Sequence, residues 1–306
     1  MKKSTFSISR KITIAAACIL IANAAFSQRL INPWSEIKES AIKENKTQRF
    51  ILPSKYKVMK LNVGELKNQL KYTKLKSSGE KKSNTIIKLP NPEGGFSNYY
   101  VYRNTTMHPD LEAKFPEIRT YNAVNTTNPS ELVKLDVTPR GFHAMVLSPD
   151  NGTFFIDPHT KGDTENYQVY YKNDYSANRE MNCNFSEHTE FIKPTNSDKS
   201  FGSCELRTYR LALACTGEYA IAVGGGTVAG ALAAQVTTMN RVNFVYERDI
   251  AVTFTIIGNN NQLIFTNPNT DPYTNNSGGQ MLGQNQSTVN NIIGSSNYDI
   301  GHVFST

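Results

Sequence analysis

The pattern of apolar and polar residues is clearest between residues 205 and 258, where it predicts a strand, a long helix and a second strand. Apolar side chains alternate with polar or small ones over 205–215, which is the two-residue period of a half-buried strand. The glycine run 224–226 breaks the chain before Thr227, a suitable N-cap for a helix. The helix then carries a stripe of apolar residues at steps of three and four that would face a sheet, namely Leu232, Val236, Met239, Val242 and Tyr246.

The second strand and the residues after it complete this unit. Phe244 lies off the apolar stripe, so we expect the helix to be covered on more than one side. Residues 251–257 are β-branched or aromatic on both faces, which predicts a strand in the interior of a sheet. Two strands joined by a crossover helix in one sheet are normally parallel. Beyond them we expect a turn and a short strand over 258–265, a helix over 285–294 and a strand over 299–305.

Residues 28–195 show a different pattern, in which short strands alternate with turn residues. A short helix is expected over 34–46, and a solvated, lysine-rich linker over 67–82. Regularly spaced short strands with turns between them predict an antiparallel sandwich or barrel. The turns are expected at 90–95, 139–141, 148–152 and 161–163. The strands are expected at 49–52, 56–61, 85–89, 97–102, 118–123, 132–137, 142–147, 153–156 and 167–171.

The chain resembles one protein family in two separate regions. Residues 206–213 and 238–254, continued by 298–306, resemble the start of the catalytic domain of a metzincin zinc protease, in particular the reprolysin-like secreted metallopeptidases of Gram-negative bacteria. Residues 107–121 and 140–158 resemble elements of propeptides in the same family. The resemblance implies a β-rich propeptide followed by an incomplete α/β metzincin-like upper subdomain with a mixed, twisted sheet.

The resemblance also implies a division of the chain. It gives a signal peptide over 1–27, a propeptide over 28–195, a maturation linker over 196–204 and the N-terminal half of a catalytic domain over 205–306. The complete enzyme would hydrolyse peptide bonds in protein or peptide substrates by a zinc-activated water, with its propeptide as an intramolecular partner.

The residues that carry this chemistry in the family do not occur in the chain. The family binds zinc through a His-Glu-x-x-His-x-x-Gly-x-x-His helix, whose glutamate polarises the zinc-bound water. None of the five histidines here is followed by glutamate. We therefore expect the chain to end before the zinc-binding helix and to be inactive by itself, and we name no catalytic or metal-binding residue.

Residues 1–27 have the organisation of a secretory signal peptide. Basic residues precede a short apolar run over 12–21, and small residues precede an expected cleavage before Gln28. The run is too short for a transmembrane anchor, and no other stretch predicts a membrane span. We expect the protein to be secreted, in a periplasmic or extracellular location.

Charge is unevenly distributed along the chain. The formal net charge is +7, and the four basic residues of the signal peptide leave +3 after its removal. Residues 201–306 sum to −2, so residues 28–200 carry the basic excess. We do not expect nucleic-acid binding, because the lysines are typical of a solvated linker. A basic propeptide facing a mildly acidic catalytic domain is the simpler hypothesis.

Three cysteines remain after removal of the signal peptide: Cys183, Cys204 and Cys215. An odd number implies either a free thiol or a partner elsewhere. One hypothesis for Cys183 is a cysteine switch, in which a propeptide thiolate occupies the fourth zinc position. The other, which we favour, is a disulfide from Cys183 to Cys204 or to another cysteine, as is usual in secreted proteins. Cys215 lies on an apolar strand face and is expected to be a small buried hydrophobe.

Some features of the sequence have more than one interpretation. The loop over 266–279 contains Asp271 and many asparagines, whose oxygens could bind calcium, although an ordinary solvated loop explains them too. The isolated histidines His108, His143 and His159 are expected to be structural. Functionally, the alternatives to a zymogen are a stand-alone propeptide-like protein that inhibits or chaperones a partner protease, and a surface adhesion protein.

Overall fold

The computed structural model describes residues 31–42, 49–76, 82–176 and 205–306. The predicted signal peptide, the predicted maturation linker, Cys183 and Cys204 lie outside the described residues. The chain divides into a unit of residues 1–32 and a unit of residues 33–306, and every described helix and strand belongs to the second.

A sheet of nine strands occupies residues 34–171, and each neighbouring pair in it is antiparallel. Its order is β1-β2-β9-β8-β7-β6-β5-β4-β3, so β3 to β9 follow one another as a meander. The strands are β1 (Trp34–Glu36), β2 (Lys57–Leu61), β3 (Ile86–Pro90), β4 (Phe96–Arg103), β5 (Arg119–Asn125), β6 (Leu132–Thr138), β7 (Gly141–Ser148), β8 (Gly152–Pro158) and β9 (Asn166–Tyr171).

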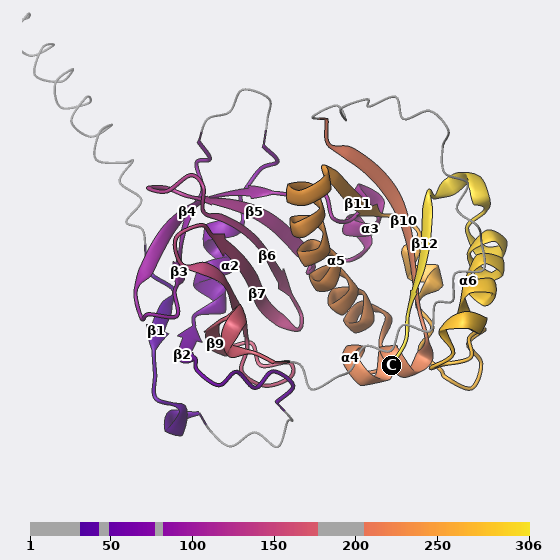
Figure 1. Ribbon diagram of the computed structural model, residues 1–306, viewed down its shortest axis with the longest axis horizontal. Coiled ribbons are helices and arrows are strands. Elements are labelled where there is room, and N and C mark those ends of the chain that lie inside the picture. The colour runs from indigo at the N-terminus through magenta and orange to yellow at the C-terminus, as the bar shows by residue number, and fades with distance from the viewer. Residues whose placement is uncertain (1–30, 43–48, 77–81, 177–204) are drawn as a thin grey trace, which may run out of the picture. The chain divides into compact units, whose positions relative to one another are not determined.

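The nine-stranded sheet curls until its two edge strands approach each other, so that it resembles a nearly closed barrel (Figure 1). Trp34 on β1 donates its Nε1–H to the carbonyl of Lys88 on β3 at 3.0 Å. Closure suits an antiparallel sheet, because an open edge leaves backbone N–H and C=O groups without partners. Of the two predicted architectures, sandwich or barrel, the observed sheet is therefore closer to the barrel.

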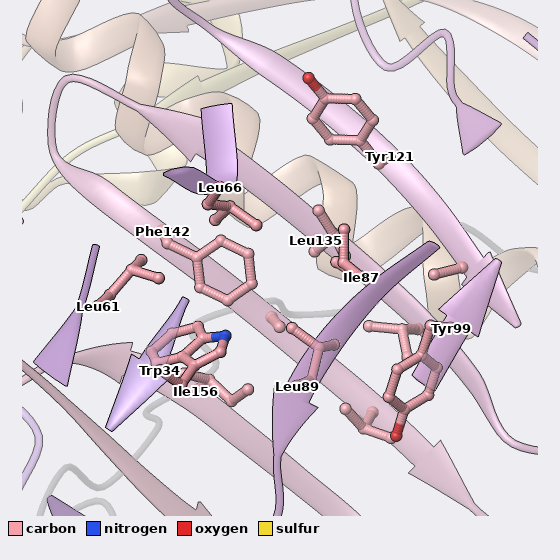
Figure 2. Close-up of a cluster of buried hydrophobic side chains, with 14 of the residues drawn as sticks. Trp34, Leu61, Leu66, Ile87, Leu89, Tyr99, Tyr121, Leu135, Phe142 and Ile156 are labelled. Carbon is pink, nitrogen blue, oxygen red and sulfur yellow. The ribbon is translucent and has the colours of Figure 1, made fainter. Parts of the chain in front are cut away.

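Apolar side chains fill the inside of the curled sheet (Figure 2). The rings of Trp34, Phe142 and Tyr167 meet edge to face, with centroids 5.4 to 6.2 Å apart. Helix α2 (Val63–Leu70) adds Leu66 and Leu70 to the same cluster. Burial of each such large side chain contributes about 1.5–3 kcal/mol relative to exposure, which makes this cluster the main support of the sheet.

Three predictions for the first part of this unit are wrong. The described part of 34–46 forms β1 and the 3-10 helix η1 (Glu39–Ala41) instead of an α-helix, because Trp34 pairs with Leu61 and its ring fills the barrel. Residues 49–52 form no strand. Lys67 belongs to α2, because the buried Leu66 and Leu70 hold a helix where the sequence indicated a linker. The η2 turn (Lys172–Asp174) and helix α3 (Pro109–Lys114) complete this part.

Residues 205–306 build a smaller sheet of three parallel strands in the order β11-β10-β12. Strand β10 (Arg207–Cys215) leads through α4 (Gly217–Gly224) and α5 (Val228–Ile250) to β11 (Val252–Ile256). The chain then passes through η3 (Asn260–Leu263), α6 (Gly278–Ile292) and η4 (Ser295–Asn297) to β12 (Ile300–Phe304). The predicted parallel strand-helix-strand unit is thereby confirmed.

Helix α5 also has the predicted start and the predicted packing. Thr227 is its N-cap, and the Thr227 side chain accepts the N–H of Gly230 at 3.1 Å. Of the predicted stripe, Leu232, Val236 and Met239 are buried and Val242 is partly buried, whereas Tyr246 is 40% exposed. Phe244 is buried on another side. The helix is therefore covered on more than one side, as predicted. No single described helix is long and apolar enough to cross a membrane, although α4 and α5, bent by 81°, reach that length and apolar content together.

Three expectations for the smaller sheet differ from the structure. Strand β11 lies at the edge of the sheet and not in its interior, and residues 106–108 bond to its outer side. Ile256 packs in a cluster with Met107 and Leu111. The ring of Phe254 lies against the rings of Tyr209 and Tyr246. Residues 258–265 form η3 and a single bridge from Cys215 to Ile264, where a short strand was predicted. All strand pairs seen between residues 205 and 306 are parallel, so the antiparallel strand of a mixed sheet is not among them.

Candidate functional site

Buried polar side chains gather at the carboxyl end of β10. The Asn260 side chain accepts the N–H of Leu213 at 2.7 Å and donates to the C=O of the same residue at 2.9 Å. Gln235, on α5, donates to the carbonyls of Leu213 and Ala214 at 3.1 and 3.2 Å. Open α/β sheets bind ligands beyond the carboxyl ends of their strands, so this end of the sheet is the candidate site.

The loop between η3 and α6 covers this end of the sheet. Asp271 accepts the N–H of Gly217 at 2.8 Å and the N–H of Tyr273 at 2.9 Å. A carboxylate at the start of α4 also interacts favourably with the helix dipole. Gly217 has no room for a side chain, because a Cβ there would collide with the backbone of Asn267 and Pro268. The contacts of Asp271 therefore give it an anchoring role in the loop that needs no calcium.

Asparagine and threonine side chains connect this loop to the ends of the strands. Thr216, after β10, donates its hydroxyl to the amide oxygen of Asn275 at 3.4 Å. Asn275 donates to the hydroxyl of Thr306 at 3.2 Å and accepts the N–H of Thr306 at 3.3 Å. The side chains named here are thus polar and neutral apart from Asp271, and they are suited to bond to backbone groups rather than to transfer protons.

The histidines of the described residues lie on separate elements. His302, on β12, stacks edge to face on Phe304, with ring centroids 5.3 Å apart. Each of the other three lies next to a different polar group. Nδ1 of His108 accepts the N–H of Asp110 at 3.2 Å, Nδ1 of His143 lies 3.0 Å from Asp136, and Nε2 of His159 lies 2.9 Å from Glu39. His188 lies outside the described residues.

The donor groups present do not fit a zinc centre. Across the described ranges, no group of three or more His, Cys, Asp or Glu side chains is arranged to hold a metal ion. A catalytic zinc needs three protein ligands around one open position. No step of zinc chemistry is therefore assigned to the described residues.

Cys215 is buried in the smaller sheet, as predicted from the apolar strand face. Burial raises the pKa of the Cys215 thiol to about 12. The thiol is therefore protonated at neutral pH, and only the thiolate is an effective nucleophile or metal ligand. The disulfide and the cysteine switch proposed for Cys183, with Cys204 as one disulfide partner, stay predictions because both residues lie outside the described part.

A buried ion pair connects α5 to the nine-stranded sheet. Nη2 of Arg241 lies 2.5 Å from Oδ1 of Asp157, whose side chain is 1% exposed. Tyr170 donates its hydroxyl to the other oxygen of Asp157 at 2.7 Å. Burial opposes the charge on Arg241, but Asp157, Tyr170 and Asp136 together outweigh burial and the pKa of Arg241 is raised. The guanidinium of Arg241 therefore keeps its charge at this contact.

A second ion pair lies further along the same helix. Nζ of Lys134, on β6, lies 3.0 and 2.8 Å from the two carboxylate oxygens of Glu247, on α5. The Lys134 side chain is 4% exposed, and burial lowers the pKa of Lys134 while Glu247 opposes this shift. The sequence pattern does not reveal these pairs, because each joins residues more than eighty positions apart. The sign of these pairs in the sequence is that charged residues of α5 lie off the apolar stripe of the helix.

Comparison with known proteins identifies a relationship for one part of the chain. The family model described as metallo-peptidase family M12B, reprolysin-like, matches residues 205–306. No curated protein matches the chain. The matched range contains β10, α4, α5, β11, α6 and β12, which is the whole of the smaller sheet with its helices. Residues 205–306 are therefore similar to a metallopeptidase of the reprolysin-like family M12B.

Proposed function

We propose that residues 205–306 are the first half of a secreted, zinc-dependent endopeptidase domain and that residues 28–195 are its propeptide. The observation that carries the proposal is the family match, because it covers the range that folds as the parallel strand-helix-strand unit and β12. The substrates would be proteins or peptides, and zinc would activate the water that attacks the peptide bond. In this proposal the zinc ligands follow Thr306 in the reading frame.

The smaller sheet is suited to be one part of a larger domain. Among the described residues, β12 forms one edge of this sheet. An edge strand presents N–H and C=O groups that can pair with another extended segment. We infer that the next strand of the peptidase domain, or an extended substrate, pairs there.

The role of residues 28–195 as an intramolecular propeptide is supported by their contacts with the matched range. The nine-stranded sheet bonds to α5 through the Arg241–Asp157 and Lys134–Glu247 pairs. A segment that engages the peptidase-like part so closely can support its folding and restrict its activity. Secretion is inferred from the predicted signal peptide over 1–27.

The test is to express the full reading frame that contains residues 28–306 and to assay cleavage of a denatured protein substrate. We expect cleavage that is abolished by a zinc chelator, restored by added zinc, and absent when the glutamate of the zinc-binding motif is replaced by alanine. A reading frame without a zinc-ligand helix after Thr306, or cleavage that is insensitive to chelation, would contradict the proposal.

A further inference from the structure

We propose that residues 33–176 and residues 205–306 pack against each other through one shared hydrophobic cluster. The two parts should therefore stay bound when the chain is cut between 177 and 204. The nine-stranded sheet would then be a retained, non-covalent subunit and not a segment that cleavage alone releases. Three contacts on different parts of the two surfaces support this inference. It holds whatever chemistry residues 205–306 perform, so it does not depend on the peptidase proposal.

The first contact is an apolar cluster shared by the two ranges. Met107, Leu111 and Ile118, from the part of the chain before the cut, are each no more than 3% exposed. They pack with residues of the smaller sheet and α5, including Leu211, Leu213, Val236, Met239 and Ile256. Separation would bring both halves of this cluster into water. Burial of apolar surface is the largest favourable contribution to most protein associations, and it should hold the cut halves together.

The second contact is a short extended segment, residues 106–108, that is joined to the edge of β11 by one parallel bridge. The N–H of Ile256 bonds to the carbonyl of Thr106 at 2.9 Å, and the N–H of His108 bonds to the carbonyl of Ile256 at 2.8 Å. Met107 lies between them in a parallel bridge with Ile256. This is the geometry by which an extended peptide binds to an exposed sheet edge, where backbone bonds give affinity and buried side chains give specificity.

Helix α3 follows this extended segment directly and fixes its position. His108 caps the start of α3, and Leu111 on α3 enters the shared cluster. Lys114, at the end of α3, donates its Nζ–H to the carbonyl of Gly258, just beyond β11, at 3.0 Å. One short segment of the first range therefore contacts the edge of β11 along its final residues and the turn after it.

The third contact is the polar surface of α5 against β6 and β8, and α5 lies beside β6 in Figure 1. Asn240 donates to the carbonyl of Leu135 at 3.1 Å and accepts from the side chain of Asn104 at 2.9 Å. The Arg241–Asp157 and Lys134–Glu247 pairs lie on the same surface. Buried ion pairs add little net affinity but penalise any other arrangement, so these groups fix the orientation that the apolar cluster holds.

The test uses the whole chain with a recognition sequence for a site-specific protease inserted between 177 and 204. After complete cutting, we expect the two fragments to elute together from a sizing column at the position of the uncut chain, in low and in high salt. They should separate only in denaturant. Two separate peaks under native conditions, or precipitation of the 205–306 fragment alone, would overturn the proposal.

Matched variants show whether the fragments bind through the described surface. Leu111→Asp places a charge in the shared cluster, whereas Leu282→Asp changes a leucine on α6 that is 71% exposed. Arg241→Ala leaves Asp157 without its ion pair, whereas Arg210→Ala removes an exposed pair with Asp299 inside the second range. We expect Leu111→Asp and Arg241→Ala to raise the dissociation constant of the cut complex about tenfold or more. We expect no change from the two control variants.

Folding of each variant is checked on the uncut chain by circular dichroism before cutting. If Leu111→Asp does not fold, Arg241→Ala carries the comparison, because it removes no apolar side chain from the shared cluster. Fragments that stay together with an unchanged dissociation constant in Arg241→Ala, and in Leu111→Asp where it folds, would show that another surface holds them and would refute the proposal.

Discussion

The side chain of Asn260 bonds to both backbone groups of Leu213, with the amide oxygen 2.7 Å from the N–H nitrogen and the amide nitrogen 2.9 Å from the carbonyl oxygen. Strand β11 ends at Ile256, so β10 loses its backbone partner on that side after Leu211. The primary amide of Asn260 takes the place of a peptide group there. Buried backbone groups need such partners, because an unpaired one costs as much as a lost hydrogen bond.

We expect Asn260→Ala to destabilise the chain by about 2 kcal/mol, because the buried N–H of Leu213 loses its acceptor. The Leu213 carbonyl would keep its bond from Gln235, so the loss falls mainly on the N–H. Urea unfolding monitored by circular dichroism measures the effect. Gln262→Ala is the control, since Gln262 lies on the same 3-10 helix but is exposed. Equal unfolding midpoints for the two variants would show that the Asn260 bonds do not stabilise the sheet.

The corner between α4 and α5 depends on the absence of a side chain at Gly230. A Cβ there would collide with the carbonyl oxygen of Gly224, which belongs to the backbone and cannot move aside. We expect Gly230→Ala to cost about 1–3 kcal/mol, as overpacking of a close contact does. The melting temperature of the purified chain should fall accordingly.

Gly283 provides the opposite case for the same substitution. It lies inside α6, and a Cβ at this position would meet no atom within 4 Å. Alanine at an unstrained helical position stabilises by about 0.4–1 kcal/mol, because glycine loses more backbone entropy on folding. We expect Gly283→Ala to raise the melting temperature while Gly230→Ala lowers it. A change of the same sign in both variants would contradict this account of the corner.

Strands β2 to β9 of the large sheet were predictable because they are short runs between turn residues, and some alternate clearly, as β7 does with its buried and partly exposed residues. The turns between them were predictable from glycines that adopt positive φ, such as Gly141 at 115° and Gly152 at 78°. The N-cap at Thr227 and the burial of Cys215 follow from local pattern in the same way. These features depend on residues a few positions apart.

The features that sequence reasoning missed depend on distant partners. Trp34 was assigned to a helix because its role is to close the barrel against β3, more than fifty positions away. Strand β11 was assigned to the interior because the segment that covers its edge, at 106–108, lies about 150 positions earlier. Asn260 and Asp271 look like loop residues in sequence, since nothing near them shows that they bond to backbone groups of Leu213 and Gly217.

Glu39 should make the stability of the large sheet sensitive to acid. The Tyr56 hydroxyl donates to both carboxylate oxygens of Glu39 at 2.9 and 2.8 Å, and this bond lowers the pKa of Glu39 from its ordinary value of 4.5, with help from His159 and Arg49. A carboxyl whose pKa is lower in the folded than in the unfolded state stabilises the fold above the unfolded value. That contribution is lost as the pH falls through the folded pKa.

We therefore expect Glu39→Gln to be less stable than the parent chain at neutral pH, with a difference that shrinks as the pH falls below 4.5. Urea midpoints measured over this pH range test the expectation. Glu165→Gln is the matched control, because Glu165 pairs with Lys60 at the surface, where both side chains are more than half exposed. A difference for Glu39→Gln that does not change with pH would show that the carboxylate is not held by these partners.

The cysteines should fall into two classes by their reactivity toward iodoacetamide. Burial raises the pKa of the Cys215 thiol to about 12, so little thiolate forms at mildly basic pH and the sheet blocks access to the sulfur. We expect iodoacetamide to leave Cys215 unmodified in the native chain. If Cys183 and Cys204 form the predicted disulfide, mass spectrometry of the chain without its signal peptide should show one added group in denaturant and three after reduction. Three groups without reduction would exclude the disulfide, and native labelling of Cys215 would contradict its burial.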